Sequence, residues 1–333
     1  MQVCVIVPLY NKAIHIGRCL ESIARQTLTD FEVVVVDDGS TDGSGDIARA
    51  FGDARFRVVA QANAGPGAAR NRGASESSAE FLAFLDADDE WLPGYLENNL
   101  NALRESGEAT AAIVCGYLES GINLEPMWRA RGLADGLFAV SQDTPPMKVV
   151  HTVAFMSPWN TVIRRSVFQR LGGFYGRTRS LYSEDAWLWI QILLNYPVLI
   201  RFDPVLALFH REASELSANL RGMRPIEPFL LEPEPLAATC PAERAQMLHD
   251  FLAIRAFKTA CALGYWGQWR QAMMLFRRFS KRGDFRLPFF WLALVCSSPI
   301  AGLLGQVWRR VGRHAPLNDL ERARQSGTRR PEA

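Results

Sequence analysis

The amino-acid sequence predicts an α/β fold in which helices flank a mostly parallel sheet, followed by a helical extension. Short apolar runs rich in β-branched residues alternate with amphipathic segments through residues 1–118. Such runs are typical of strands buried on both faces. Strict alternation of strand and helix favours parallel strands joined by helical crossovers. A chain of 333 residues, 48% of them hydrophobic, suffices for one large domain and an appendage.

The elements are expected in the following order. Strand 3–7 precedes Asn11, which is expected to cap a helix with Ile16, Leu20 and Ile23 on one face. The many Gly and Pro residues in 119–147 predict a loop region over an active site. The other expected strands are 32–36, 56–60, 80–85, 111–117 and 160–164, and the other expected helices are 43–51, one after Gly65, one opened by Pro93, 166–171 and 186–194.

Carboxylates follow two of the predicted strands. Asp37 and Asp38 end the second strand, and Asp86, Asp88 and Asp89 follow the fourth. The carboxyl ends of parallel strands meet at one edge of a sheet, where ligands bind. So many carboxylates at one edge would repel each other unless a cation joined them, and Mg²⁺ or Mn²⁺ bridging to a phosphate is a common solution. The sequence therefore predicts a metal-assisted site for a nucleotide diphosphate.

Charge is distributed unevenly along the chain. Residues 1–240 hold 21 Lys and Arg against 29 Asp and Glu, whereas 241–315 hold 12 against 3. No charged leader precedes the first strand and the six cysteines lack close pairs, so we expect a cytoplasmic protein without signal peptide, disulfide framework or zinc site. The expected parts are a catalytic domain over 1–220, a Pro-rich linker over 221–241, a helical, basic and apolar membrane-associating region over 242–315, and a disordered tail over 316–333.

One segment near the carboxyl end points to a membrane. The 22 residues from Leu287 to Trp308 carry no charged side chain, and that length reaches across a hydrocarbon layer of ~30 Å. Pro288 and Pro299 interrupt the segment, so a broken helical hairpin lying in the membrane interface is the alternative to a spanning one. Basic residues at both ends suit anionic headgroups in either geometry.

Five motifs in succession resemble those of the family 2 inverting glycosyltransferases, which have the GT-A fold. One such motif would be weak evidence, but five in register are specific. The resemblance covers roughly residues 1–215. The motifs are Val7-Pro8-Leu9-Tyr10-Asn11, Val36-Asp37-Asp38-Gly39-Ser40-Thr41-Asp42, Gly65-Pro66-Gly67-Ala68-Ala69-Arg70-Asn71-Arg72-Gly73, Phe84-Leu85-Asp86-Ala87-Asp88-Asp89 and Ser183-Glu184-Asp185.

The resemblance implies a reaction and a set of site residues. It implies transfer of a sugar from a nucleotide diphosphate sugar, a UDP-sugar above others, to an acceptor hydroxyl with inversion. Asp185, with Glu184 beside it, would be the general base, and Asp88 would bind Mg²⁺ or Mn²⁺. His210 resembles a metal-ligating histidine of the family, although its offset from later residues departs from the usual pattern and a lone histidine is more often structural. The residues implied to bind the nucleotide sugar are Pro8, Tyr10, Asn11, Asp37, Asp38, Arg70 and Asp86.

The implied acceptor is a glycan or its lipid-linked precursor, in the synthesis of a cell-surface polysaccharide or glycolipid on the cytoplasmic face of the inner or plasma membrane. No nucleic-acid partner is expected. A sugar-phosphate nucleotidyltransferase is one alternative, but that class is expected to carry a Gly-rich loop with a basic residue where this chain has Pro8 to Asn11. A non-catalytic nucleotide- or glycan-binding module is another, and Asp185 argues against it. Asn11 and Asp42 have a competing interpretation as helix caps.

Overall fold

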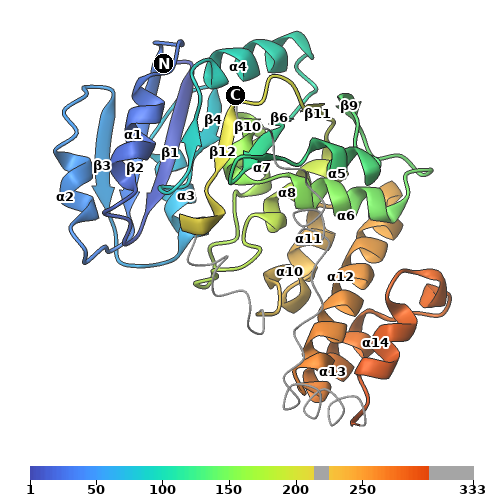
Figure 1. The fold of residues 1–333 in the computed structure, drawn as a ribbon. Coiled ribbons are helices and arrows are strands. Elements are labelled where there is room, and N and C mark those ends of the chain that lie inside the picture. The colour runs from blue at the N-terminus through green and yellow to red at the C-terminus, as the bar shows by residue number, and fades with distance from the viewer. Residues whose placement is uncertain (214–224, 300–333) are drawn as a thin grey trace, which may run out of the picture. The chain divides into compact units, whose positions relative to one another are not determined.

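The computed structural model describes residues 1–213 and 225–299, and the chain divides into two compact units, Met1–Leu248 and His249–Ala333. The first unit contains a large sheet of eight strands and a small sheet of four (Figure 1). The expected α/β fold with a large, mostly parallel sheet flanked by helices is confirmed. The strands of the large sheet, as they lie side by side, are β3 (Phe56–Ala60), β2 (Phe31–Asp37), β1 (Val3–Leu9), β4 (Phe81–Phe84), β10 (Thr161–Arg164), β6 (Ala112–Cys115), β11 (Val198–Arg201) and β9 (Gly136–Phe138).

The first four strands of this order form the half of the sheet that the sequence predicted in most detail. Strand β2 pairs in parallel with β1 and β3, and β1 pairs in parallel with β4. Residues Val3 to Val7 and Val33 to Val36 have no exposed surface. Burial of both faces explains why these runs are continuously apolar instead of alternating. Their parallel pairing brings the carboxyl ends of β1, β2 and β4 to one edge.

In the second half of the sheet, β10 and β9 run against the other strands, while β6 and β11 keep the direction of β4. Strand β10 is antiparallel to both β4 and β6, and β9 is antiparallel to β11. The expected strand 111–117 is broken at Gly116 into β6 and β7 (Tyr117–Glu119), which belong to different sheets. A Cβ at Gly116 would lie 2.4 Å from the carbonyl oxygen of Phe202, so only glycine allows this close approach.

In the small sheet, the strand that follows the acidic segment pairs with the last described strand of the chain. Its order is β5 (Glu90–Trp91), β12 (Ala207–Phe209), β7 and β8 (Ile122–Asn123). Residues 85–89 therefore connect a strand of the large sheet to a strand of the small one. Asp89 reinforces the junction, because its Oδ1 accepts a hydrogen bond of 2.8 Å from the backbone N–H of His210.

The first helix of the unit has an amphipathic face. Helix α1 (Ile16–Ala24) buries Ile16, Cys19, Leu20 and Ile23, the spacing of one helical face. The helix begins at Ile16, so the predicted cap at Asn11 is wrong: the N-cap is His15, and Asn11 has a positive φ of 50°. The other helices of the unit are α2 (Ser44–Arg49), α3 (Pro66–Ser75), α4 (Tyr95–Glu105), α5 (Glu125–Ala130), α6 (Pro146–Phe155), α7 (Arg165–Leu171), α8 (Ala186–Asn195), α10 (Pro228–Leu231) and α11 (Glu234–Thr239).

Two ranges are more regular than the sequence predicted. The range 119–147, expected to be a loop, contains β8, α5, β9 and the start of α6. The described part of the expected linker, 225–241, contains α10 and α11, and each has a proline in its first helical turn. Proline at that position favours a helix start because its φ is already helical and no N–H is lost. The described part of the Pro-rich range is therefore largely helical.

The second unit is helical over its described residues, as the sequence predicted for this part of the chain. It contains α12 (Ala245–Tyr265) from His249 onward, α13 (Trp269–Phe279) and α14 (Phe290–Cys296). Three aromatic rings pack together in this unit, with centroids 5.2–5.5 Å apart: Phe257, Phe276 and Phe290. His249 Nε2 lies 3.0 Å from a carboxylate oxygen of buried Asp284.

The apolar segment expected to meet a membrane is described only as far as residue 299. Over that part it forms α14, a helix of seven residues. Among residues 1–213 and 225–299, no helix combines the length and the apolar character needed to cross a membrane. Residues 300–308 and the expected tail 316–333 lie outside the described residues.

Candidate functional site

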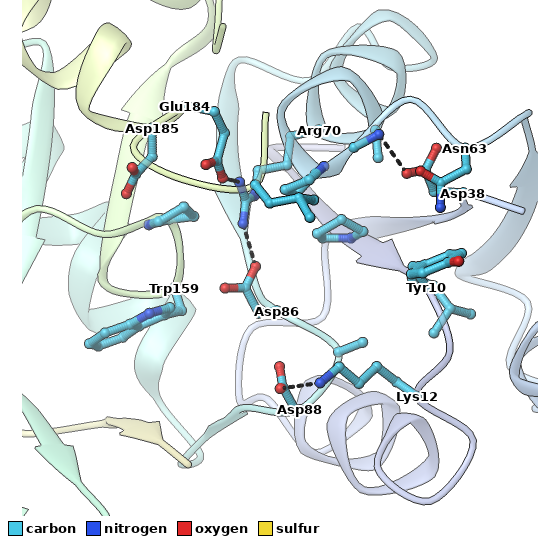
Figure 2. Close-up of a pocket in the computed structure, with 18 of the residues that line it drawn as sticks. Tyr10, Lys12, Asp38, Asn63, Arg70, Asp86, Asp88, Trp159, Glu184 and Asp185 are labelled. Atoms are coloured by element: carbon cyan, nitrogen blue, oxygen red, sulfur yellow. Dashed lines mark hydrogen bonds and ion pairs between the residues drawn. The ribbon is translucent and has the colours of Figure 1, made fainter. Parts of the chain in front are cut away.

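A cavity of about 360 Å³ opens at the carboxyl ends of β1, β2 and β4. This volume is within the range of small-ligand sites. Figure 2 shows Tyr10, Asp38 and Asn63 at one end of the cavity, Trp159 and Asp185 at the other, and Arg70 and Asp86 between them. The lining residues are Pro8, Leu9, Tyr10, Lys12, Asp38, Asn63, Gly65, Pro66, Ala69, Arg70, Asp86, Ala87, Asp88, Ser157, Pro158, Trp159, Arg179, Leu181, Glu184 and Asp185.

Asp38 forms one wall by fixing the loop that follows β3. Its Oδ1 accepts hydrogen bonds from Gln61 Nε2 at 2.7 Å and from the Ala64 N–H at 2.8 Å, and its Oδ2 accepts one from the Gly65 N–H at 2.8 Å. A carboxylate that receives three N–H groups is held in one rotamer. The loop residue Asn63 thereby stands beside the cavity.

Two other residues predicted to bind the nucleotide sugar make contacts within the protein and do not line the cavity. Asp37 accepts a hydrogen bond from the Ser40 N–H at 3.0 Å and an ion pair from Arg49 at 3.2 Å. Asn11 accepts a hydrogen bond from the Thr41 N–H at 2.8 Å through its side-chain oxygen. Of the adjacent pair Asp37 and Asp38, only Asp38 reaches the cavity.

Arg70 lies at the floor of the cavity and joins two acidic groups. Its side chain is 4% exposed, its Nη1 donates to Glu184 Oε1 at 2.8 Å, and its Nη2 donates to Asp86 Oδ1 at 2.6 Å. Burial opposes the guanidinium charge, but the charges of Asp86 and Glu184 outweigh it and raise the pKa of Arg70. The planar fork of an arginine suits this double contact. Arg70 therefore connects the carboxyl end of β4 to the segment before α8.

Glu184 and Asp185 stand at the amino end of α8. Asp185 is the N-cap and accepts a hydrogen bond from the Ala186 N–H at 2.8 Å, and Trp189 Nε1 lies 3.4 Å from its other oxygen. Burial, and then the neighbouring charge of Asp185, raise the pKa of Glu184 to about 7. Burial also raises the pKa of Asp185, while the Arg70 charge opposes the rise. A carboxylate with a raised pKa in a cavity has the properties of a proton acceptor.

Close packing of α3 brings Arg70 to this segment. A Cβ on Gly67 would lie 2.2 Å from the Tyr175 carbonyl oxygen and 3.1 Å from Glu184 Cγ. One turn further along α3, the Asn71 side chain accepts from the Phe174 N–H at 2.9 Å and donates to the Phe174 carbonyl at 2.8 Å. Glycine and asparagine at these two positions therefore dock residues 174–185 onto the helix that carries Arg70.

Asp86 and Asp88 face the cavity from the connection between β4 and β5. Lys12 Nζ forms an ion pair of 2.8 Å with Asp88 Oδ2 and also donates to the Ala213 carbonyl at 3.0 Å. Burial and the charge of Asp86 raise the pKa of Asp88. In the described part of the chain, no group of three or more His, Cys, Asp and Glu side chains is arranged to hold a metal ion.

This donor set fits a divalent cation only if the ligand supplies most of the coordination. Asp88 offers a carboxylate oxygen, the type of ligand that Mg²⁺ and Mn²⁺ prefer. Mg²⁺ is commonly bound through one or two carboxylates plus substrate phosphates instead of an all-protein cage. A cation beside Asp88 would favour the ionised carboxylate, which burial and the charge of Asp86 disfavour.

His210 lies at the end of β12, away from the cavity lining. Its Nε2 is 2.8 Å from Glu90 Oε1 and its Nδ1 is 3.1 Å from Glu212 Oε1. Both ring nitrogens are thus engaged by carboxylates. A metal role for His210 stays a prediction.

Several lining residues escaped the sequence reasoning. Trp159 stacks on Phe209 with ring centroids 5.1 Å apart and meets Tyr117 edge-on at 4.5 Å, which fixes an aromatic wall near Asp185. Lys12 directly follows the first motif. Its positive charge, so near the predicted acidic edge of the sheet, was the signal that could have identified it. Asn63, Arg179 and Leu181 lie in irregular segments whose course no local pattern predicts.

Comparison with known proteins assigns the first half of the chain to a family. The profile of Glycosyl transferase family 2 matches residues 4–172. The uncharacterized glycosyltransferase EpsJ of Bacillus subtilis (strain 168) is 32% identical over 186 residues. That match spans 55% of this chain and 52% of EpsJ, about half of the relative's length.

Two solved structures share the fold at low sequence identity. S. aureus TarS 1–349 in complex with UDP-GlcNAc superposes with a TM-score of 0.69 at 21% identity, covering 96% of this chain and 95% of that one. The mannosyltransferase PcManGT from Pyrobaculum calidifontis, in complex with GDP-Man and Mn²⁺, gives a TM-score of 0.53 at 19% identity, covering 93% of this chain and 88% of that one.

Proposed function

The chain belongs to glycosyl transferase family 2, and on this premise we propose that it transfers one sugar from a UDP-sugar to an acceptor hydroxyl with inversion at the anomeric carbon. The observation that carries the proposal is the single cavity with Asp38 at one end and Asp185 at the other, with Arg70 and Asp86 between. Family membership favours glycosyl transfer over nucleotidyl transfer or a binding module.

In this proposal the nucleotide occupies the end of the cavity near β1 and β2. Tyr10 supplies an aromatic face beside the base, while Asp38 holds the loop that presents Asn63. Asp86 contacts the ribose with its oxygen that Arg70 does not hold. The UDP and UDP-GlcNAc complexes of TarS support a uridine nucleotide as the donor.

Asp88 is the proposed ligand of Mg²⁺ or Mn²⁺. Such a cation, when bound, neutralises charge that develops on the diphosphate as it leaves. The Mn²⁺ complex of PcManGT supports a divalent metal in a protein of this fold. Lys12 and Arg70 add positive charge to the lining of the same cavity.

Asp185 is the proposed catalytic base. Its carboxylate accepts the proton of the acceptor hydroxyl while that oxygen attacks the anomeric carbon opposite the departing diphosphate. The hydrogen bonds from the Ala186 N–H and the Trp189 indole orient the carboxylate. Trp159 lines the cavity on the same side, and its packing on Phe209 and Tyr117 makes this part of the wall rigid.

The acceptor is proposed to be a glycan or lipid-linked precursor at the cytoplasmic face of a membrane, in the synthesis of a surface polysaccharide or glycolipid. Residues 249–299 hold 8 Lys and Arg against 2 Asp and Glu. On α14, Trp291, Leu292 and Val295 expose 61%, 55% and 62% of their surfaces. Apolar side chains beside basic ones suit the interface of an anionic bilayer.

The proposal is tested with a panel of nucleotide diphosphate sugars in the presence of Mn²⁺ or EDTA. A bound donor at 100 times its Kd should raise the free energy of unfolding by about 2.7 kcal/mol, which a thermal-shift assay detects. Mass spectrometry or NMR of the product then gives the anomeric configuration. Hydrolysis or transfer at an undiminished rate in EDTA and with Asp88→Ala would remove the metal from the proposal, and a retained configuration would remove the single displacement.

A further inference from the structure

Lys12 occupies the carboxylate on which the proposed cation depends. Its Nζ lies 2.8 Å from Asp88 Oδ2, and the two side chains are only 17% and 11% exposed. Figure 2 shows the ammonium and the carboxylate facing each other at one side of the cavity. A pair this shielded from water is held more strongly than an exposed surface pair.

The ammonium group and a divalent cation are alternatives at this carboxylate. A charged lysine has three donors and no acceptor, so it cannot itself become a metal ligand. Two positive charges beside one partly buried carboxylate would repel each other strongly, because little water screens them. In the free protein, the charge of Asp88 is therefore already compensated by Lys12.

Apart from Asp88, the described residues offer few ligands to a cation that enters without a nucleotide. No arrangement of three acidic, histidine or cysteine side chains suited to a metal exists within residues 1–213 and 225–299. One oxygen of the neighbouring carboxylate, Asp86 Oδ1, accepts from Arg70 at 2.6 Å. Without the diphosphate, a cation at Asp88 would gain few protein ligands and would lie beside the Lys12 ammonium.

We propose that Lys12 makes cation binding at Asp88 conditional on the donor diphosphate, so that nucleotide and metal enter together or in that order. This depends on the cation role proposed above for Asp88. A diphosphate in the cavity supplies the missing oxygen ligands and also offers the Lys12 ammonium a new anionic partner. Lys12 then leaves Asp88 without becoming an unpaired buried charge, which would be costly.

The experiment is a Mn²⁺ titration of the full chain followed by the EPR signal of free Mn²⁺, with and without saturating UDP. Wild-type protein should bind Mn²⁺ weakly alone and at least tenfold more tightly with UDP, on the order expected for removal of one like charge. Lys12→Gln should bind Mn²⁺ without UDP on the order of tenfold more tightly than wild type, and UDP should add less. Lys12→Arg retains the charge and should behave like wild type.

Two controls assign the effect to Asp88. Lys148→Gln removes a lysine on α6 that does not line the cavity, and its Mn²⁺ binding should match wild type. The double variant Lys12→Gln, Asp88→Asn should lose the gain of Lys12→Gln. Circular dichroism of each variant establishes that it is folded, and Lys12→Met serves as a second neutral side chain if Lys12→Gln is not.

The outcomes separate this inference from the proposed function. If UDP promotes Mn²⁺ binding but folded Lys12→Gln and Lys12→Met bind Mn²⁺ alone no better than wild type, the role of Lys12 is overturned and the metal role stands. If Mn²⁺ binds no variant even with UDP, the metal role of Asp88 fails and the inference fails with it. Tight Mn²⁺ binding to the wild type without UDP also overturns the inference.

Discussion

Arg70 and Glu184 are separated by 114 positions in the chain, yet Nη1 of one lies 2.8 Å from Oε1 of the other. The same guanidinium holds Asp86 through Nη2. The buried guanidinium of Arg70 thus connects the acidic segment after β4 to the carboxylates before α8. The donor and acceptor ends of the proposed site share this single residue, and the first prediction concerns its loss.

Arg70→Gln should impair both turnover and stability. Removing the charge leaves Glu184 and Asp86 without their buried counter-charge, which typically costs about 3–5 kcal/mol in unfolding free energy. Turnover should fall on the order of 10²-fold or more, because Glu184, the neighbour of the base, and Asp86, the ribose contact, lose the guanidinium that holds them. Arg72→Gln is the matched control, since Arg72 is 52% exposed on the same helix and pairs with Glu76. Chemical denaturation and steady-state kinetics measure both, and equal small effects in the two variants would contradict the role of Arg70.

Asp185→Asn should separate binding from chemistry. Asparagine retains the shape and the acceptor oxygen for the Ala186 N–H, but it does not take a proton from an acceptor hydroxyl. We expect UDP affinity within a few fold of wild type and turnover lower on the order of 10²-fold or more. Calorimetric UDP titration beside single-turnover kinetics makes the comparison. A parallel loss of affinity and turnover would reduce Asp185 to a helix cap.

The pH dependence of turnover should follow the carboxyl pair. Burial raises the pKa of Asp185, and transfer requires its ionised form, so kcat should fall as pH is lowered on the acid side. Because the charge of Arg70 lowers the pKa of Asp185, Arg70→Gln should move this fall to higher pH. A kcat profile that is unchanged in Arg70→Gln would exclude Asp185 as the titrating group.

Stability should change with pH in the opposite sense. The pKa of Glu184 is raised from 4.5 to about 7 in the folded protein. Its contribution to the free energy of unfolding is therefore complete below 4.5, the pKa in the unfolded chain, and is lost as pH rises through about 7. Glu184→Gln cannot ionise and should flatten the decline in unfolding free energy over this window. Exposed Glu105→Gln is the control. Urea denaturation across the window measures the slope, and identical slopes in all three proteins would refute the prediction.

Two glycines on helices should respond oppositely to alanine. Gly67→Ala places a Cβ 2.2 Å from the Tyr175 carbonyl oxygen, and such overpacking costs about 1–3 kcal/mol. Gly17→Ala on α1 meets nothing within 4 Å and should stabilise by about 0.5–1 kcal/mol through helix propensity. Thermal or urea unfolding compares them. Gly67→Ala should also lower turnover, because Glu184 Cγ lies 3.1 Å from the added carbon.

Binding to anionic vesicles should depend on α14. Trp291→Asp with Val295→Asp removes two exposed apolar side chains and should abolish cosedimentation with vesicles of phosphatidylglycerol and phosphatidylcholine. Leu137→Asp, which changes a 60% exposed leucine of the first unit, is the control. Binding of the wild type should weaken with salt, since each basic residue contributes about 1 kcal/mol near an anionic surface. Equal sedimentation of both variants would contradict a membrane role for this helix.

The sequence was most informative where structure is set locally. Short, continuous runs of β-branched residues such as Val33 to Val36 favour a strand buried on both faces, and the acidic residues at the ends of such strands then meet at the sheet edge. The antiparallel direction of β10 could not be predicted from its residues, because buried parallel and buried antiparallel strands are both apolar. It depends on the crossover between distant segments.

The same distinction applies to the candidate site. Arg70 lies on α3, and Asp38, Asp86 and Asp88 closely follow buried strands, so their motifs are positioned by regular elements, and all four line the cavity. Asn11 also belongs to a motif, but its side-chain oxygen accepts a hydrogen bond from the Thr41 N–H and the residue does not line the cavity. Trp159 reaches the cavity only through its packing on Phe209 and Tyr117. Contacts between such distant residues depend on tertiary packing, which no local pattern in the chain predicts.

The connection over residues 85–89 has a thermodynamic consequence for ligand binding. It is anchored at one end in the large sheet and at the other in the small one, and Arg18 Nη2 donates to the Asp88 carbonyl at 2.9 Å between them. A segment so tethered has few conformations left to lose, because its ordering entropy was spent when the chain folded. Ligand binding at Asp86 and Asp88 should therefore incur little further entropic penalty from this backbone. The enthalpy and entropy of binding measured by calorimetry should then arise mainly from electrostatic contacts and released water.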